Sequence, residues 1–581
     1  MCFTATLPKS YYRISARQIQ CDRGYSTRNH THLVGNSISM EQSNDGPLSI
    51  RQVLQVDNEI DNLVVQLSSL GARRNGTLPI YRLPSELIAQ VFKKLAAIQK
   101  PGNHTGVLRL GWIVVTHVCQ HWRNIALQHT NLWTTISSGL GSQWMEEMLA
   151  RSASLPLDIQ FEARQADEVY SLTENFHRAA HLHLIVEDPK DMRNFLRCPA
   201  PLLETCNLSG NGHSYGLSDV LFANAAPRLR RLEMTSLILP WTCAGLVSLV
   251  DLSITYDGMK SLRERFAPTY HSELYQVLSR MPNLESLTLV YCLPAHWHRN
   301  EAFPNLDNTG AAISLPVLKH LSITSAVVDV AVFLGSCRLS PTCKLVIGCD
   351  TNYPNGTGHL KEFATVLPDL LRSTDKPLLR LAIHASKPDK TYTLSLWTSA
   401  HPWPGGPLFP SDSNHPSCSE EESKPNVQIV GYTLASFWSS SGLEVSRAIS
   451  LTAYNLCPRN LEVLDLMGDK LQWDWAQFHP AMTCVQQIRV HRSLGLALLD
   501  YLAGPVALHL RTITIAGGPR SRVPTEAKEA ALFKAFYKTM KKRRRMAAPL
   551  ERLYLPGYSE ELLEDIELAT NVPTWVTYEC P

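Results

Sequence analysis

The chain has 581 residues, a length that corresponds to roughly three or four domains or to one elongated array. Apolar residues make up 44% of it and charged residues 18%, as in proteins that bury a core, and a net charge of +3 on this length argues against a general affinity for nucleic acid. The fourteen cysteines include no C-x-x-C pair, so we expect reduced thiols in a cytoplasmic or nuclear protein rather than a disulfide framework.

The first segment, residues 1–46, is rich in Ser, Thr and Asn and holds more basic than acidic residues. Mitochondrial transit peptides share this composition. The apolar residues of the segment form no sustained helical stripe, so we favour a disordered basic tail.

Residues 47–76 carry apolar residues at alternating spacings of three and four, which predict a short coiled-coil-like helix that ends at Gly71. The apolar positions are Val53, Val56, Ile60, Leu63, Leu67 and Leu70. A seam this short more often folds back on its own domain than it dimerises. The sequence therefore favours an intramolecular role for residues 53–70 over a dimer.

Residues 79–136 predict two amphipathic helices that pack as a small bundle. Pro84 suits the first turn of a helix, and apolar residues follow it at helical spacing. In the first helix these are Leu87, Ile88, Val91, Phe92 and Leu95, and in the second Val115, Val118, Cys119, Trp122, Ile125 and Ala126. So small a bundle buries too little surface to be stable alone, and it should pack against a partner or the rest of the chain.

This segment resembles an F-box of the kind found in large fungal families. The resemblance rests on Leu83-Pro84 at the start of the first helix, on the run Val118–Arg123, and on the flanking segments Pro79–Arg82 and Asn131–Trp133. The spacer from Ala96 to Gly111 is longer than in compact F-boxes. The resemblance implies an adaptor that docks on the Skp-type subunit of a cullin-based ubiquitin ligase.

Within the F-box we predict two groups of residues. Apolar residues on so small a bundle otherwise lack cover, so one group should face the Skp-type adaptor. It comprises Leu83, Pro84, Ile88, Phe92 and Leu95. The second group should form the core of the bundle, and comprises Val118, Cys119, Trp122 and Trp133.

Residues 137–581 repeat the pattern L-x-x-L-x-L, with other aliphatic residues or Cys allowed. Copies begin at Leu203, Leu229, Leu249, Leu284, Leu318, Leu378, Leu461, Val485, Leu510 and Leu550. The pattern predicts leucine-rich repeats with an exposed, disordered loop at about 387–427, where Pro, Ser and acidic residues are dense. The expected fold class is α + α/β, a small helical F-box bundle followed by an irregular leucine-rich-repeat solenoid.

The resemblance implies the non-catalytic substrate-receptor subunit of an SCF-type cullin ubiquitin ligase, whose repeats bind an unknown protein substrate. Polar residues that alternate with buried Leu or Ile on the strands are candidate substrate contacts. They are Thr288, Ser322, Asp465 and Arg489. Two alternatives remain open, a leucine-rich-repeat scaffold without ligase function and a serine hydrolase built around Ser214.

The hydrolase alternative rests on residues 212–216, which match the nucleophile motif G-x-S-x-G. A turn at 209–211 precedes the motif where a buried strand should lead into it, so we do not expect catalysis. His296 and His298 lack the spacing of zinc ligands, and no Gly-rich phosphate loop occurs, so we expect no metal or cofactor. The longest apolar run, 236–250, contains Pro240 and is too short for a membrane span.

The one strong charge run, Lys541–Arg545, follows a predicted helix over residues 526–540. It is typical of a nuclear-import signal or acidic-partner patch, and equally of a solvated helix end whose cations favour the helix dipole. Aromatic residues are not interleaved with the basic ones, which argues against nucleic-acid binding.

Overall fold

In the computed structural model the chain divides into two compact units, Met1–Arg82 and Leu83–Pro581. The described residues are 50–104, 107–163, 172–186, 196–210, 215–216, 221–238, 246–256, 270–294, 313–340, 342–351, 356–371, 379–386, 391–397, 427–432, 441–456, 460–468, 471, 473–516, 526–556, 558–572 and 574–575. The predicted basic tail, 1–46, lies outside them.

The first unit contains one long helix, α2 (Ile50–Gly76), followed by the 3₁₀ turn η1 (Pro79–Arg82). The helix continues through Gly71 to Gly76, so its predicted end at Gly71 is wrong. A single Gly costs about 1 kcal/mol in a helix, which is too little to stop one of this length.

The second unit begins with the helical bundle, which consists of α3 (Ser85–Ile98), η2 (Gly111–His117), α4 (Gln120–Gln128) and η3 (Thr130–Trp133). The second helix that the spacing predicts is divided in two. Cys119 takes an extended backbone conformation between η2 and α4, with φ −161° and ψ 165°. The spacing of apolar residues gives no sign of this break, because the side chains before and after it still face one core.

The long spacer between α3 and η2 forms a β-hairpin. Strands β1 (Gly102–His104) and β2 (Val107–Arg109) pair antiparallel, and the Trp112 amide then donates a 2.9 Å hydrogen bond to the Gln99 carbonyl oxygen. Gly111 makes this return with a φ of +55°, and a Cβ there would lie 2.5 Å from the Gln99 oxygen. The spacer therefore needs glycine at this position.

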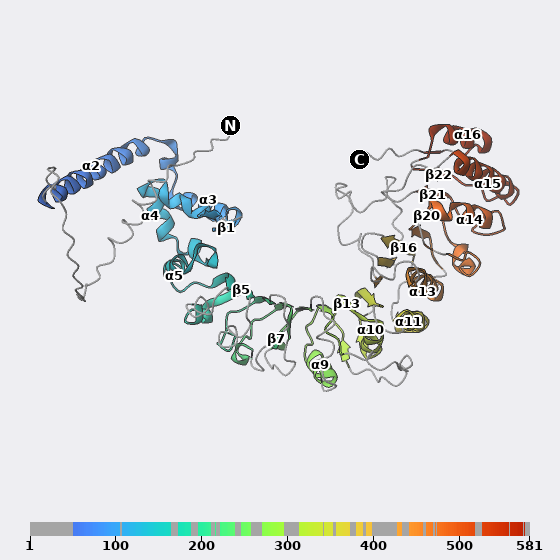
Figure 1. Ribbon diagram of the computed structural model, residues 1–581, viewed down its shortest axis with the longest axis horizontal. Helices are drawn as coiled ribbons and strands as arrows, with labels where there is room; N and C mark the ends of the chain where they lie inside the picture. The colour runs from blue at the N-terminus through green and yellow to red at the C-terminus, as the bar shows by residue number, and fades with distance from the viewer. Residues whose placement is uncertain are drawn as a thin grey trace, which may run out of the picture. The chain divides into compact units, whose positions relative to one another are not determined.

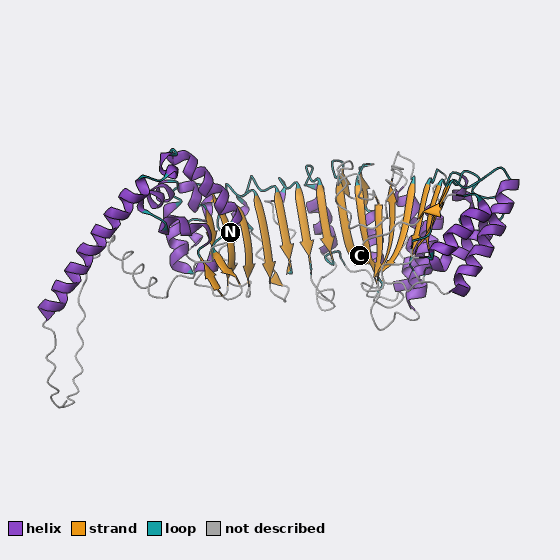
Figure 2. Ribbon diagram, turned by 90° about the horizontal axis from the view of Figure 1, so that it is seen from above, coloured by secondary structure: helices purple, strands orange, loops and turns teal. Residues whose placement is uncertain are grey.

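After the bundle comes a parallel sheet, which has nine strands among the described residues. They lie side by side in Figure 2 and pair in the order β3 (Thr135–Ser137), β4 (Leu157–Ala163), β5 (Ala179–Val186), β6 (Thr205–Gly210), β8 (Arg231–Thr235), β10 (Asp251–Thr255), β11 (Ser286–Val290), β13 (His320–Ala326) and β15 (Lys344–Asp350).

Beyond β15 the pairing becomes mixed. Strand β18 (Val427–Tyr432) pairs parallel with β15, while β17 (Thr391–Trp397) is antiparallel to both β18 and β16 (Arg380–Ser386). Parallel pairing then resumes from β16 through β19 (Val463–Met467), β20 (Gln487–His491), β21 (Thr512–Ala516), β22 (Arg552–Tyr554) and β23 (Thr574–Trp575).

The predicted fold class, a leucine-rich-repeat solenoid after the bundle, is wrong. The second unit is instead a large parallel sheet with helices, of α/β type, joined to a mixed sheet. Strands do lie where the L-x-x-L-x-L copies occur, but β15 pairs with β18 rather than with the next copy, β16. Periodic Leu residues mark which segments form strands and carry no information on which strands pair.

The predicted loop over about 387–427 is wrong in part, because β17 lies inside it and joins the sheet. Its sequence, TYTLSLW, alternates Tyr, Leu and Leu with polar residues, which is a strand pattern. The Pro-rich part, 398–426, lies outside the described residues.

Helices pack on the same face of the sheet along much of its length (Figure 1). They are α5 (Ser142–Arg151), α9 (Tyr270–Ser279), α10 (Val327–Gly335), α11 (Gly356–Leu371), α13 (Ser441–Leu456), α14 (Arg492–Leu502), α15 (Glu526–Arg545) and α16 (Glu560–Thr570). Shorter elements are η4 (Ser138–Leu140), η5 (Phe176–Arg178), η6 (Phe222–Asn224), η10 (His479–Thr483) and the two-strand pairs β7 (Tyr215–Gly216) with β9 (Leu237–Ile238) and β12 (Ile313–Leu315) with β14 (Cys337–Leu339).

The core of this unit lies on the side of the sheet that buries alternate strand residues. In β11, for example, Leu287 and Leu289 are buried while Ser286, Thr288 and Val290 are only half-buried on the other side. None of the helices in the described part of the chain is long and apolar enough to cross a lipid bilayer.

Candidate functional site

The helical bundle leaves apolar side chains uncovered on its surface. On α3, Leu87 is 45% exposed and Val91 59% exposed, although Ile88 and Phe92 beside them are buried. Further exposed apolar residues of the bundle include Leu83, Val114, Val118 and Ile98. Monomeric proteins seldom leave so many large apolar side chains exposed on one small element, so this surface is a candidate docking site. We call these six residues the apolar surface of the bundle.

The predicted adaptor-binding group is only partly at the surface. Leu83 and Pro84 are exposed and Leu95 is half-buried, but Ile88 and Phe92 are buried in the bundle core, so the prediction is wrong for these two. The reason is that the apolar residues of α3 form one broad stripe, and residue spacing alone does not say which edge of it packs inward. Leu87 and Val91 occupy the outward face in their place.

The predicted core group also divides. Trp133 is fully buried, and Trp122 is half-buried with its ring edge-on to Phe92 at a centroid distance of 5.3 Å. Cys119 is half-buried at the break before α4. Val118 is 57% exposed, so its assignment to the core is wrong. The irregular turn between η2 and α4 rotates this side chain away from the bundle.

A second candidate surface is the face of the parallel sheet opposite the buried Leu residues. The strand register places its side chains in two rows that cross the sheet. One row is Asp158, His181, Thr205, Arg231, Asp251, Ser286, His320 and Lys344, and the other is Gln160, His183, Asn207, Glu233, Ser253, Thr288, Ser322 and Val346. We call these two rows the polar face.

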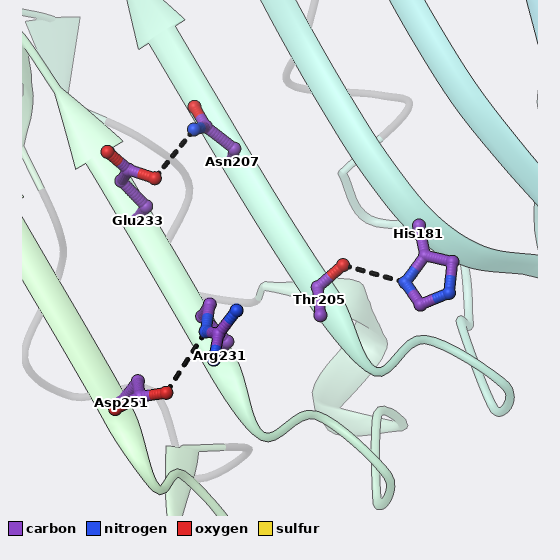
Figure 3. Close-up of polar contacts among 6 residues, drawn as sticks. All are labelled: His181, Thr205, Asn207, Arg231, Glu233 and Asp251. Atoms are coloured by element: carbon purple, nitrogen blue, oxygen red, sulfur yellow. Dashed lines mark hydrogen bonds and ion pairs between the residues drawn. The ribbon is translucent and has the colours of Figure 1, made fainter. Parts of the chain in front are cut away.

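Cross-strand contacts hold part of the polar face in place (Figure 3). His181 Nδ1 lies 2.8 Å from Thr205 Oγ1, Asn207 donates from Nδ2 to Glu233 Oε2 at 2.7 Å, and Arg231 Nε pairs with Asp251 Oδ2 at 3.0 Å. Arg231 and Glu233 are nevertheless exposed. The side chains are therefore positioned by their neighbours and still accessible to a ligand, an arrangement that lowers the entropy cost of binding.

A shallow pocket of ≈ 220 Å³ lies on this part of the polar face. It is lined by Asp158, His181, Leu182, His183, Thr205, Cys206, Asn207, Arg231 and Glu233. Its lining carries hydrogen-bond donors, acceptors and charges of both signs beside the apolar Leu182 and Cys206. Among the described residues, no group of His, Cys, Asp and Glu is placed to hold a metal ion.

Two of the predicted substrate contacts lie on the polar face and two do not. Thr288 and Ser322 are register neighbours in its second row and are half-buried. Asp465 of β19 is fully buried and Arg489 of β20 is nearly so, so their assignment to an accessible surface is wrong. Arg489 Nε lies 3.6 Å from Asp465 Oδ1, and this pair belongs to the interior.

The burial of Asp465 follows from its position in the mixed sheet. All five residues of β19 are buried, whereas β11 buries alternate residues only, so alternation on β19 does not mark an exposed face. Arg380 of β16 lies near the pair, and its own guanidinium stacks 4.2 Å from the Trp397 ring centroid. Burial lowers the pKa of Arg380, an effect that Asp465 opposes and Arg489 adds to.

The basic run is not continuous at the surface. Arg543 is fully buried and donates from Nε to the Ala548 carbonyl oxygen and from its two terminal nitrogens to those of Val506 and Ala507. Arg544 donates to the Thr570 carbonyl oxygen. Two arginines of the run therefore hold α15 against neighbouring segments of the chain, and only the rest of the run is available to bind a receptor. Ser214, His296 and His298 lie outside the described residues.

The chain matches none of the protein-family models, and a search of curated proteins finds no similar sequence.

The sequence interpretation missed most of the polar face. His181, Asn207, Arg231, Glu233 and Asp251 each lie one residue from a buried Leu, Cys, Met or Ile on a strand. The same alternation predicted Thr288 and Ser322 as surface residues. Applying it to every copy of the L-x-x-L-x-L pattern would have identified the missed residues as well. Their pairing across strands depends on register, which the sequence does not supply.

Proposed function

We propose that this chain is the substrate receptor of an SCF-type cullin ubiquitin ligase, acting in the cytoplasm or nucleus. The bundle would bind the Skp-type adaptor, and the polar face would bind a protein substrate. The chain itself would contribute no catalysis. The observation that carries the proposal is the apolar surface of the bundle, which stays exposed on the segment that resembles an F-box.

The energetics favour a partner for this surface. Full burial of an exposed Leu or Val side chain gains about 1.5 to 3 kcal/mol, and Leu83, Leu87 and Val91 are about half exposed, so covering each would contribute about half of that to a contact. The buried side of α3 packs on η2 and α4 through Ile88 and Phe92, which keeps the outward side chains in fixed positions. A rigid apolar surface of this kind fits an apolar groove on an adaptor.

The polar face supports the second half of the proposal. Its first row carries Asp158, Arg231, Asp251 and Lys344, so charges of both signs recur across the sheet. Alternating charges and short hydroxyl side chains discriminate among polar partners, because a mismatched segment leaves charges unpaired. Such a face selects one protein over another rather than binding proteins in general.

The adaptor contact is tested by co-purification of the full chain with a Skp-type adaptor. The variant Leu87→Asp with Val91→Asp places charges on the outward face of α3, where it should abolish co-purification and leave thermal stability nearly unchanged. The matched control is Leu496→Asp, because Leu496 is a Leu of similar exposure, 43%, on α14. The control should bind the adaptor normally.

Two results would contradict the proposal. One is adaptor binding that survives Leu87→Asp with Val91→Asp, and the other is a wild-type chain that binds no adaptor. The substrate half needs its own measurement, which is the set of proteins retained by the full chain. Arg231→Ala with Glu233→Ala should change that set without loss of the adaptor, whereas Arg228→Ala, at an exposed turn before β8, should not.

A further inference from the structure

Helix α2 carries an apolar seam that is open to solvent along its length. Val56, Ile60, Leu63, Leu67 and Leu70 are between 52% and 68% exposed. Their spacings of four, three, four and three are those of the a and d positions of a coiled coil. A helix of 27 residues is about 40 Å long, so it presents a seam rather than an isolated apolar patch.

From Asp57 onward the charges of α2 are separated between its two halves, and Arg51 lies in its first turn. Asp57, Glu59 and Asp61 lie in the first half, and no Lys or Arg occurs between residues 52 and 72. Arg73 and Arg74 lie in the last turn, and no acidic residue occurs between 62 and 76. The three acidic residues and these two arginines are exposed. Beyond Arg51 the helix is therefore acidic in its first half and basic in its last turn.

Although the short length of the seam favoured an intramolecular role, its exposure leads us to another conclusion, and we propose that α2 binds α2 of a second copy of this chain as an antiparallel coiled coil. In the antiparallel register that aligns a with d positions, Ile60 packs on Leu70 of the second copy and Leu63 on Leu67. Glu59 and Arg73 then occupy g positions that flank the seam, and each meets its opposite charge on the other helix. The symmetry of the pair creates this contact twice.

The charges disfavour the parallel alternative. The heptad of α2 puts Arg74 at an a position. A parallel pair would therefore place Arg74 of one helix against Arg74 of the other inside the seam. It also places the acidic half of one helix level with the acidic half of the other. In the antiparallel pair Arg74 instead lies over Val56, close to Asp57, where its aliphatic stem packs and its charge is matched. This inference does not depend on the proposed function.

The oligomeric state of the full chain tests the inference. Sedimentation over about a hundredfold range of concentration should show a monomer–dimer equilibrium for the wild type. Leu63→Asp with Leu67→Asp should give a monomer at every concentration. The matched control is Val65→Asp, because Val65 is 67% exposed on the same helix but lies at an f position, away from the seam. It should dimerise like the wild type.

A charge exchange tests the orientation. Glu59→Arg alone and Arg73→Glu alone should each weaken the dimer about three- to tenfold, because two attractive contacts become repulsive. Combining them should restore the wild-type affinity. Rescue requires residues 59 and 73 to meet between helices, since they lie about 21 Å apart along one helix.

The inference is overturned by a wild-type chain that stays monomeric, by a dimer that persists when Leu63 and Leu67 are both Asp, or by equal effects of the seam variant and Val65→Asp. Single charge changes without effect, or without rescue, would overturn the antiparallel arrangement. A monomer whose α2 amides are strongly protected from hydrogen exchange would show that the chain covers the seam with its own residues instead.

Discussion

The indole rings of Trp112 and Trp133 meet edge to face, with ring centroids 4.9 Å apart and planes inclined by 65°. Trp133 also donates from Nε1 to the Ala126 carbonyl oxygen at 2.8 Å, and the Arg151 guanidinium lies 4.3 Å from its ring centroid. Elements η2, α4 and α5 therefore all contact this one buried side chain. Trp133 joins the bundle to the first helix that packs on the sheet.

Replacement of Trp133 should destabilise the second unit more than any other change within the bundle. Trp133→Ala removes a fully buried ring and the hydrogen bond to Ala126, at a cost of about 3 to 5 kcal/mol. Trp122→Ala should cost less, because Trp122 is only half-buried. Denaturant unfolding followed by circular dichroism measures both, and a larger loss for Trp122→Ala would contradict this assignment.

Gly111 should tolerate no side chain. Gly111→Ala forces an L residue to a φ of +55°, at a cost of about 1 to 3 kcal/mol, and adds a contact of 2.5 Å between the new Cβ and the Gln99 carbonyl oxygen. Gly102→Ala is the control, since a Cβ at Gly102 meets nothing within 4 Å and its φ is not positive. Thermal unfolding should show a lower midpoint for Gly111→Ala only, and equal midpoints would mean that the spacer rearranges at no cost.

Local features of the fold were predictable from the sequence, and long-range ones were not. Apolar spacing located α3 and ten of the strands, because burial on one side imposes a period on the residues themselves. The pairing of β15 with β18 joins residues 345 and 427, and nothing in either strand specifies the other. The break at Cys119 was not predicted for a related reason, since a change of backbone direction leaves the apolar spacing intact.

The same limit, local features predictable and long-range packing not, applies to the residues of the candidate surfaces. Leu83 and Pro84 are exposed, whereas Ile88 and Phe92 are buried, because a broad apolar stripe gives no sequence sign of which edge packs inward. Asp465 is polar and alternates with Leu464 and Leu466, as a surface residue would. Its burial depends on the packing of both faces of β19, which comes from distant parts of the chain.

The buried guanidinium of Arg543 should be structural. Arg543→Ala leaves the carbonyl oxygens of Val506, Ala507 and Ala548 without their donor, which we expect to cost about 2 to 4 kcal/mol. Lys542→Ala removes an exposed charge from the same run and should change stability by less than about 0.5 kcal/mol. Urea unfolding of both variants checks this, and similar losses would show that the whole run acts through its charge.

Stability should fall as the pH rises above 9. Burial raises the pKa of the Cys349 thiol from 9.0 to about 12, and it raises the pKa of the Tyr454 hydroxyl from 10.0 to about 12. The unfolded chain therefore loses these protons at a lower pH than the folded chain does. Above pH 9 the folded state holds more protons, so the free energy of unfolding decreases until the folded groups titrate near pH 12.

Substitution of a single thiol separates this effect from general alkaline damage. Cys349→Ala removes one group that titrates differently in the two states, so the urea midpoint should fall less steeply between pH 9 and pH 12 than in the wild type. Cys484→Ala is the control, because the Cys484 side chain is exposed and should leave the slope unchanged. The slope is the informative quantity, since either substitution also shifts the midpoint at pH 7. Equal slopes for all three proteins would show that the buried thiol does not contribute to the pH dependence.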